Sequence, residues 1–240
     1  MKRIVLPSVD KPGIQAELTE QQVHYLFDVV RLSAGDSLVV TDGRGNQYRA
    51  ELLSRNRRAC EIIAPVAADA EAKVDVTLCL PLLKGNKLEL VVQKAVELGV
   101  ARIMLYQARR SVVRPGNWDK KLERWKTIAL AATQQCGRSR VPEISGLHSL
   151  DQLADKGQLA LYAWEEAEGP GLQGYWQQQR DTGAGVALLI GPEGGLDKEE
   201  VSQLDSCGFS PVTLGPRILR AETAALAMVA CTMYALGQME

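Results

Sequence analysis

The sequence predicts an α/β protein in which a small β-rich domain precedes a parallel sheet covered by helices on both faces. Two observations support this class. Short strand-like segments and a glycine turn fill the first 70 residues, whereas strands and helices alternate from residue 74 onward. Such alternation builds parallel sheets, because each helix returns the chain to the end of the sheet at which the previous strand began, and the next strand then runs in the same direction. We therefore expect domains at 1–70 and 74–240, with a linker at 64–73.

In the N-terminal part, the clearest prediction is a β-hairpin. Ser37–Thr41 and Gln47–Leu52 read as strands, and the turn between them, Asp42–Asn46, contains two glycines. Cys60–Ile63 is a further strand candidate. A short helix is expected at 19–30, where apolar residues recur at helical spacing. Together these elements predict a small β-barrel.

The C-terminal part shows a regular alternation of elements. The expected strands are Val74–Leu80, Arg102–Tyr106, Leu159–Ala163, Val186–Ile190 and Pro211–Leu214. The expected helices lie at 86–98, Asn117–Gln135, 197–206 and 221–236. No internal repeat or low-complexity tract interrupts this pattern.

Composition excludes several classes of protein. No apolar run approaches the ~20 residues that span a bilayer, and no signal-peptide core precedes Pro7, so we expect a cytoplasmic protein without membrane contact. The five cysteines show no C-x-x-C spacing and predict reduced thiols rather than disulfides or a zinc site. With only His24 and His148, a histidine-based metal site or catalytic triad has little to build on. No metal is expected.

The net charge of −1 conceals an uneven distribution. Residues 101–140 hold ten Lys and Arg against two Asp and Glu, whereas residues 141–240 hold five against fourteen. The field near a surface follows local charge, so a neutral chain can still present a phosphate-binding face. The alternative is an ordinary solvated helix face, which the charge alone does not exclude.

Three late strands run into loops of unusual composition. These segments are Leu161–Glu165, Leu189–Leu196 and Leu214–Thr223, and the last two each contain Gly-Pro. In parallel sheets, ligands bind outside the carboxyl ends of the strands. Glycine lets the backbone approach a ligand closely, so these loops predict a pocket suited to an adenine edge read by main-chain hydrogen bonds. One such loop could be an ordinary turn; two favour a function, although neither matches a phosphate-binding motif.

The same loops carry a resemblance to a known family. Residues 189–195 (Leu-Ile-Gly-Pro-Glu-Gly-Gly) and 214–224 (Leu-Gly-Pro-Arg-Ile-Leu-Arg-Ala-Glu-Thr-Ala) resemble the two signature loops of the RsmE family. That family belongs to the knotted SPOUT methyltransferases and methylates N3 of a uridine in 16S ribosomal RNA. Further similarity lies at residues 84–89, 93–99 and 134–138, with a weaker match at 24–32, so the resemblance covers nearly the whole chain.

The resemblance implies a PUA-like RNA-recognition barrel, a SPOUT domain with a C-terminal trefoil knot, a homodimer, and S-adenosylmethionine as cofactor. It implies cofactor contacts at Leu161, Tyr162, Ile190, Gly191, Gly195, Leu214, Ile218 and Leu219. Uridine N3 must lose its proton before it attacks the methyl group, so we expect Arg220 to stabilise the anionic base. Alternatively, Arg220 pairs with Glu222 or Glu193 and merely fixes the loop. Glu222 is expected at the start of the last helix rather than as a base.

The expected partner is 16S rRNA or the small ribosomal subunit. The residues predicted to contact RNA phosphates are Arg31, Arg109, Arg110, Arg114, Arg138 and Arg140. The apolar last helix, with Ala225, Met228, Val229 and Met233, adds to the expectation of a homodimer. Two other functions stay open: a SPOUT methyltransferase acting on another RNA, and a noncatalytic RNA-binding factor for ribosome assembly.

Overall fold

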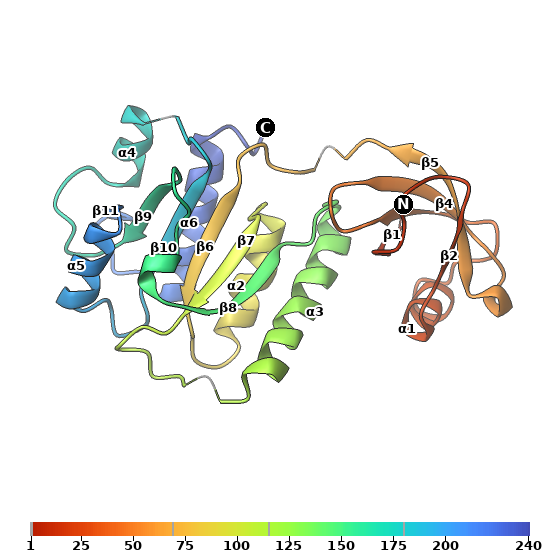
Figure 1. Ribbon diagram of the computed structural model, residues 1–240, viewed down its shortest axis with the longest axis horizontal. Helices are drawn as coiled ribbons and strands as arrows, with labels where there is room; N and C mark the ends of the chain where they lie inside the picture. The colour runs from red at the N-terminus through yellow and green to blue at the C-terminus, as the bar shows by residue number, and fades with distance from the viewer. Residues whose placement is uncertain (1, 69, 115, 180) are drawn as a thin grey trace. The chain divides into compact units, whose positions relative to one another are not determined.

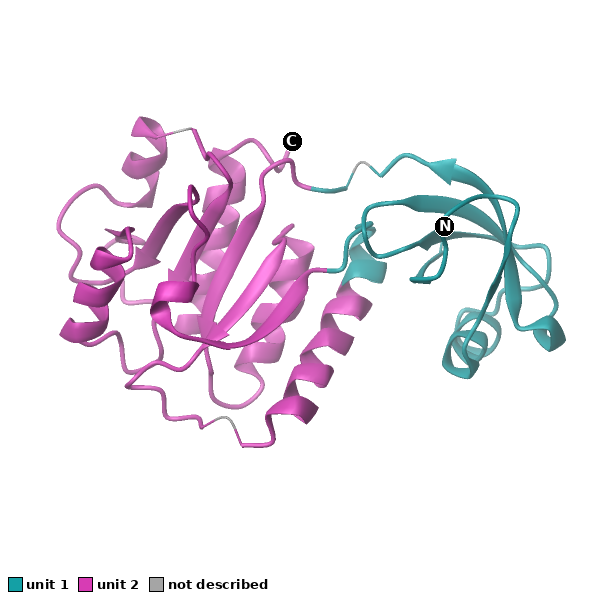
Figure 2. Cartoon of the chain, viewed as in Figure 1, with its two compact units in different colours: residues 1–71, 133–141 teal, residues 72–132, 142–240 magenta. Residues whose placement is uncertain are grey.

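The computed structural model describes residues 2–68, 70–114, 116–179 and 181–240, and the chain divides into two compact units (Figure 2). One unit comprises residues 1–71 and 133–141; the other comprises 72–132 and 142–240. The domains predicted from the sequence were the continuous ranges 1–70 and 74–240, which placed residues 133–141 in the second domain. Within the described ranges, no helix has the length and apolar character to cross a membrane.

The N-terminal unit is built on one five-stranded sheet. In spatial order its strands are β1 (Lys2–Val5), β3 (Ser37–Thr41), β4 (Gln47–Leu52), β5 (Ala59–Val66) and β2 (Gln15–Glu17). The predicted hairpin is confirmed as β3 and β4. In β4, buried Tyr48, Ala50 and Leu52 alternate with exposed Arg49 and Glu51, as a strand with one face on a core requires.

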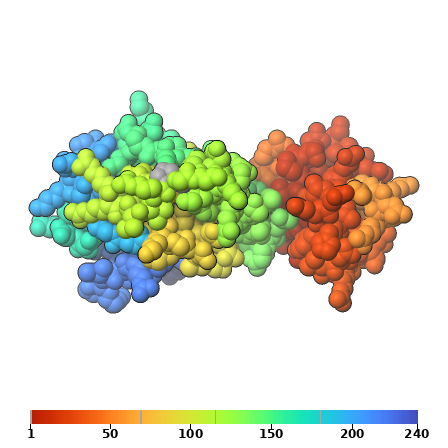
Figure 3. Space-filling view, turned by 90° about the horizontal axis from the view of Figure 1, so that it is seen from below, coloured from red at the N-terminus to blue at the C-terminus, as the bar shows by residue number. Residues whose placement is uncertain are grey.

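Sequence patterning missed β1 and β2 because they are short and pair with strands distant in the chain. The predicted helix at 19–30 consists of α1 (Glu20–His24), capped by Thr19, and a π-helical turn over Tyr25–Val29. Val23 and Leu26 of this segment lie in the same core as the sheet. These N-terminal residues form a compact body in the space-filling view, coloured red to orange (Figure 3).

A carboxylate anchors residues 138–140 within the N-terminal unit. Glu71 accepts hydrogen bonds from Nε and Nη2 of Arg138, at 3.1 and 2.9 Å, and from the backbone N–H of Ser139 and of Arg140, at 2.7 and 2.8 Å. The linker predicted at 64–73 begins too early, because β5 continues to Val66 and Glu71 is hydrogen-bonded within the N-terminal unit, whose boundary falls after residue 71. Such interactions escape sequence patterns because the partners lie 67 or more residues apart.

Replacing Glu71 by alanine is expected to destabilise the N-terminal unit by ~3 kcal/mol, because it leaves the buried Arg138 guanidinium without its carboxylate. Burial raises the pKa of Glu71, but the Arg138 guanidinium and the N–H groups of Arg140 and Ser139 lower it more. The stabilisation is thus present above the ordinary pKa and is lost as pH falls through the lower folded pKa. Urea unfolding across acidic pH, with exposed Glu61→Ala as control, checks both effects; equal stability of the two variants would contradict them.

The C-terminal unit is a six-stranded sheet in which every pair is parallel (Figure 1). Its strands, in spatial order, are β11 (Phe209–Val212), β9 (Leu159–Ala163), β10 (Val186–Ile190), β6 (Val76–Pro81), β7 (Arg102–Tyr106) and β8 (Glu143–His148). The helices are α2 (Lys87–Glu97), α3 (Trp118–Cys136, of which residues 133–136 belong to the N-terminal unit), α4 (Leu172–Gln178), α5 (Lys198–Ser206) and α6 (Ala221–Ala235).

Helices cover both faces of this sheet, as predicted. Helix α6 packs on β10 and β6 and contacts α2 and α4 on one side. On the other side α5 contacts β11 and the short 3₁₀ segment Leu150–Gln152, which together close a second apolar core over β9 and β10. Because β9, β10 and β11 are parallel neighbours, their carboxyl ends lie together at one end of the sheet, and the three loops of unusual composition begin there.

Two predictions about this unit were wrong. The last strand lies at Phe209–Val212 rather than at 211–214, and Pro211 is tolerated because β11 is an edge strand that pairs only with β9. Thr213 and Leu214 are consequently released into the loop. The apolar residues of α6 cited for a dimer (Ala225, Met228, Val229 and Met233) are fully buried within the chain, so they offer no surface to a partner.

Candidate functional site

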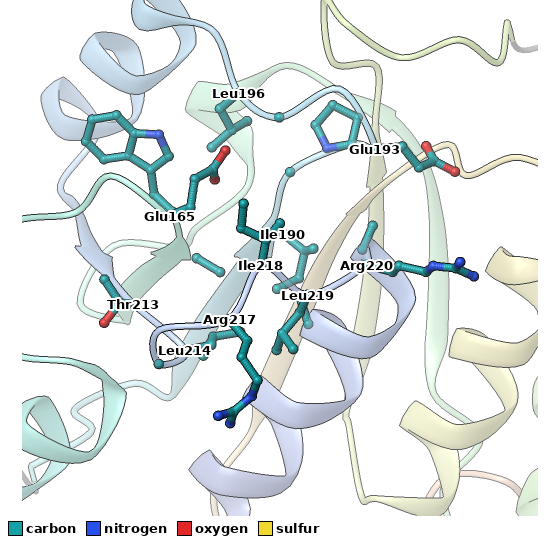
Figure 4. Close-up of a pocket in the computed structure, with 18 of the residues that line it drawn as sticks. Glu165, Ile190, Glu193, Leu196, Thr213, Leu214, Arg217, Ile218, Leu219 and Arg220 are labelled. Carbon is teal, nitrogen blue, oxygen red and sulfur yellow. The ribbon is translucent and has the colours of Figure 1, made fainter.

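A cavity of about 500 Å³ lies at the carboxyl ends of β9, β10 and β11 (Figure 4). Its walls come from the loops that follow these strands, at 163–165, 190–196 and 213–220, with Lys87, Ala221 and Ala224 completing the lining. The strand register explains why the three loops meet. Ala163 pairs with Ile190 on one side and with Val212 on the other, so the three strands end side by side. This volume falls in the range of small-molecule sites.

Two glycines let the backbone form the cavity wall. Gly195 has φ +73°, a conformation that other residues adopt at a cost of ~1–3 kcal/mol. A Cβ at Gly195 would lie 3.4 Å from Oε1 of Glu165 across the cavity, and a Cβ at Gly191 would lie 3.1 Å from the side chain of Leu196. A Cβ would thus be crowded at Gly191 and strained by the positive φ at Gly195, so bare backbone lines the cavity at these points, which suits a ligand read by main-chain groups.

The buried side chain of Tyr106, at the end of β7, holds the end of β10 in place. Its hydroxyl donates a 2.8 Å hydrogen bond to the carbonyl of Ile190, the residue from which the cavity loop departs. Burial, with the carboxylate of Glu200 and the thiol of Cys79, raises the pKa of Tyr106 well above its usual range, so the hydroxyl stays a protonated donor. The loop thus leaves the sheet from a rigid point.

The structure brings together six of the eight residues predicted to contact a cofactor. These are Ile190, Gly191, Gly195, Leu214, Ile218 and Leu219. Leu161 and Tyr162 lie instead in the buried sheet, and the Tyr162 hydroxyl donates to Asp205 at 2.9 Å. From β9 the lining residues are Ala163, Trp164 and Glu165, one to three positions further along the chain. The pattern of the strand end had included Ala163, Trp164 and Glu165, but the contacts implied by the resemblance were Leu161 and Tyr162, which lie before the strand leaves the buried sheet.

A three-residue ion cluster borders the cavity and was not predicted. Lys87, at the start of α2, places its Nζ 3.4 Å from Oε1 of Glu193 and 3.4 Å from Oε2 of Glu222. Glu193 also accepts the backbone N–H of Lys84 at 3.2 Å. Burial raises the pKa of Glu193, but the N–H groups of Lys84 and of Glu193 itself and the Lys87 ammonium lower it overall, so the carboxylate stays ionised.

Arg220 lines the cavity at the N-cap position of α6. Among the described residues, neither Glu193 nor Glu222, the two carboxylates offered by the sequence as its partners, pairs with Arg220; both pair with Lys87. Glu222 lies in the first turn of α6, as predicted. In Figure 4, Arg217 and Arg220 extend to different sides of the cavity, Arg220 on the same side as Glu193.

Two of the predicted phosphate contacts in the C-terminal unit already have partners in the chain. The Arg109 guanidinium pairs with Glu199 and Asp197, and its backbone N–H donates to the buried Glu200 at 2.8 Å. Arg110 donates to the carbonyl of Gly194 at 3.3 Å, and a Cβ on Gly194 would lie 3.1 Å from the Arg110 Cβ. The segment carrying both arginines therefore supports the cavity loop.

The other predicted phosphate contacts differ in exposure. Arg138 is 4% exposed and bound to Glu71, a position that argues against phosphate binding. Arg31, Arg114 and Arg140 are exposed. Arg31 has φ +62°, an unusual conformation for a residue other than glycine. Across the described residues, no group of three His, Cys, Asp or Glu side chains is arranged to hold a metal ion.

Comparison with known proteins agrees with this architecture. Residues 70–233 match the model of an RNA methyltransferase domain, and residues 18–64 match that of an RNA methyltransferase PUA domain. The ribosomal RNA small subunit methyltransferase E of Bacillus subtilis is 33% identical over 227 residues, covering 90% of this chain and 89% of the relative. The protein of that name from Synechocystis is 35% identical over 211 residues, covering 86% and 69%.

A solved structure matches over almost the whole length. The ribosomal RNA small subunit methyltransferase E of Neisseria gonorrhoeae, crystallised with S-adenosylmethionine, is 30% identical with a TM-score of 0.87, covering 98% of this chain and 97% of that one. The matched models, the identity across both units and the cavity at the strand ends agree. The chain belongs to the ribosomal RNA small subunit methyltransferase E family.

Proposed function

We propose that this protein methylates N3 of a uridine in 16S rRNA, with S-adenosylmethionine as methyl donor. The observation that supports this most directly is the cavity between the loops 190–196 and 213–220, in a chain whose solved relative carries that cofactor. The methyl group comes from the sulfonium of S-adenosylmethionine. We assign cofactor contacts to Ile190, Gly191, Gly195, Leu214, Ile218 and Leu219 and add Ala163, Trp164 and Glu165, with Leu161 and Tyr162 as support beneath them.

The chain's own groups must favour loss of the N3 proton. A positive charge beside the base lowers the pKa of N3, because it favours the anionic form. Arg220 supplies this charge at the mouth of the cavity, and the N-terminal end of α6 adds a partial positive charge at the same place. Arg220 is therefore the catalytic residue of this proposal, acting by electrostatic stabilisation.

The decisive experiment compares ribosomal RNA from cells with and without the gene by mass spectrometry. We expect one N3-methyluridine of 16S rRNA to disappear and to return when the gene is restored. Loss of a methyl group from transfer RNA or a ribose 2′-hydroxyl would instead support another SPOUT activity. Calorimetry with S-adenosylmethionine tests the noncatalytic alternative, since an assembly factor without cofactor affinity would release no heat.

We propose that exposed arginines bind the RNA backbone, with Arg114 and Arg140 as the principal contacts, Arg31 as a further one, and Arg109 sharing its charge with Glu199. Replacing Arg114 and Arg140 together by alanine should reduce the slope of log affinity against log salt by roughly 0.7–0.9 unit for each lost contact. Binding titrations at several salt concentrations measure this slope. Lys156→Ala, an exposed change elsewhere, serves as control; an unchanged slope in the double variant would show that these arginines are only solvated.

We further propose that the protein is a cytoplasmic homodimer and that the segment after β10 forms the trefoil knot implied by the resemblance. With the apolar face of α6 buried, support for the dimer comes from the family resemblance, and we place Tyr234 of α6, which is 74% exposed, in the interface. Sedimentation velocity should show a dimer at micromolar concentration, and Tyr234→Glu should weaken it. A monomer under these conditions would rule out the dimer.

A further inference from the structure

We propose that Lys87 is a positioning residue that sequesters Glu193 and Glu222 and thereby leaves the Arg220 guanidinium free to face the anionic uracil. The inference rests on the proposed function and concerns charge at the mouth of the cavity. Lys87, Glu165, Glu193, Arg217 and Arg220 are the charged residues among those that line it. Of the lining cations, Lys87 alone has its charge compensated by ion pairs among the described residues.

The two carboxylates would otherwise be natural partners for Arg220. Glu222 follows Arg220 by two residues in the first turn of α6. Glu193 lies on the same side of the cavity as Arg220 (Figure 4). A guanidinium paired with a carboxylate has little charge left for a second anion, so such a pair would quench the group that is expected to stabilise the base.

Lys87 is well placed to prevent this pairing. Its side chain is one-third exposed, and its Nζ stands 3.4 Å from an oxygen of each carboxylate. Oε2 of Glu222 is buried and accepts no hydrogen bond from the described residues, so the Lys87 charge is its compensation. Glu193 has a second partner in the Lys84 N–H. Removing the ammonium would leave Glu222 as a buried, uncompensated carboxylate, which is unfavourable, and Arg220 is a cation nearby in the chain.

A variant series separates sequestration of the carboxylates from direct catalysis and from simple structural support. Lys87→Met removes the ammonium and keeps both carboxylates. The triple variant Lys87→Met, Glu193→Gln, Glu222→Gln removes all three charges together. Lys87→Arg keeps a cation at the position. Each is measured for kcat against pH with 16S rRNA as substrate, for S-adenosylmethionine affinity by calorimetry, and for thermal unfolding.

We expect Lys87→Met to move the acidic limb of the pH–rate profile to higher pH by roughly one unit, because loss of a free positive charge raises the pKa of the bound N3. Below both pKa values this is a rate loss of about tenfold. The triple variant should return the limb toward its original position, because no carboxylate remains to occupy Arg220. Lys87→Arg should leave the limb in place.

Two results of this series would overturn the inference. In the first, the acidic limb stays in place in Lys87→Met. In the second, the triple variant is as impaired as Lys87→Met although its cofactor affinity and melting temperature are unchanged. The second result would show that Lys87 itself is the active cation. If the triple variant does not fold, Lys87→Met is instead combined with Arg220→Ala. An upward movement of the limb beyond that of Arg220→Ala alone would show that Lys87 acts without Arg220 and would equally overturn the inference. If the unaltered protein leaves 16S rRNA unmethylated, the proposed function fails first and the inference falls with it.

Discussion

Replacing Gly195 by valine is expected to abolish useful binding of S-adenosylmethionine. At φ +73°, a residue with a side chain is strained by ~1–3 kcal/mol, and this strain alone corresponds to a loss of affinity of about 5- to 150-fold if the loop relaxes away from its bound form. The two added methyl groups would also occupy space beside Glu165, because the Cβ alone would be in van der Waals contact, at 3.4 Å, with Oε1 of that residue. The two effects act in the same direction, so binding should fall below detection by calorimetry.

Gly208 offers a matched control for this experiment. It has φ +84°, a similar backbone strain, but it follows α5 outside the cavity and its Cβ would meet nothing within 4 Å. Gly208→Val should therefore lower the melting temperature while leaving cofactor affinity close to that of the unaltered protein. Normal cofactor affinity in Gly195→Val would show that the cofactor does not lie against this loop.

Replacing Arg220 by alanine is expected to lower kcat by on the order of 100-fold, the usual effect of removing one preorganised group that stabilises charge in a transition state. Affinity for S-adenosylmethionine should change little, because the proposed role of the guanidinium concerns the base. The acidic limb of the pH–rate profile should move upward, because the N3 anion is then formed without the help of the positive charge. Initial rates of methyl transfer to 16S rRNA, measured over a range of pH, give both kcat and the position of the acidic limb.

Arg217 is the matched control for Arg220, since it lines the same cavity three residues earlier and is also exposed. It extends to a different side of the cavity (Figure 4). Arg217→Ala should leave the position of the acidic limb unchanged, and Arg220→Lys should recover part of the lost rate. Equal losses in the two alanine variants, without movement of the limb, would indicate that the loop needs both arginines only for RNA attraction.

Several features of this protein were determined by local sequence. The hairpin at 37–52 follows from alternating burial on either side of a glycine turn, and the boundaries of β7, β9 and β10 were predicted to the residue. The positions of the two Gly-Pro loops followed as well, because the strands before them are apolar and glycine and proline act on their own backbone. The individual residues came from the family resemblance of these loops, and six of those eight line the cavity.

Contacts between distant parts of the chain were decided only by the tertiary structure. Glu71 and Arg138 are 67 positions apart, Lys87 and Glu193 are 106 apart, and Arg110 and Gly194 are 84 apart. Periodicity and composition describe neighbours along the chain, so they could show that these residues are charged but not which charges meet. An arginine looks the same in sequence whether it faces solvent or a buried carboxylate, and this is why Arg138 was expected to face RNA and lies instead against Glu71.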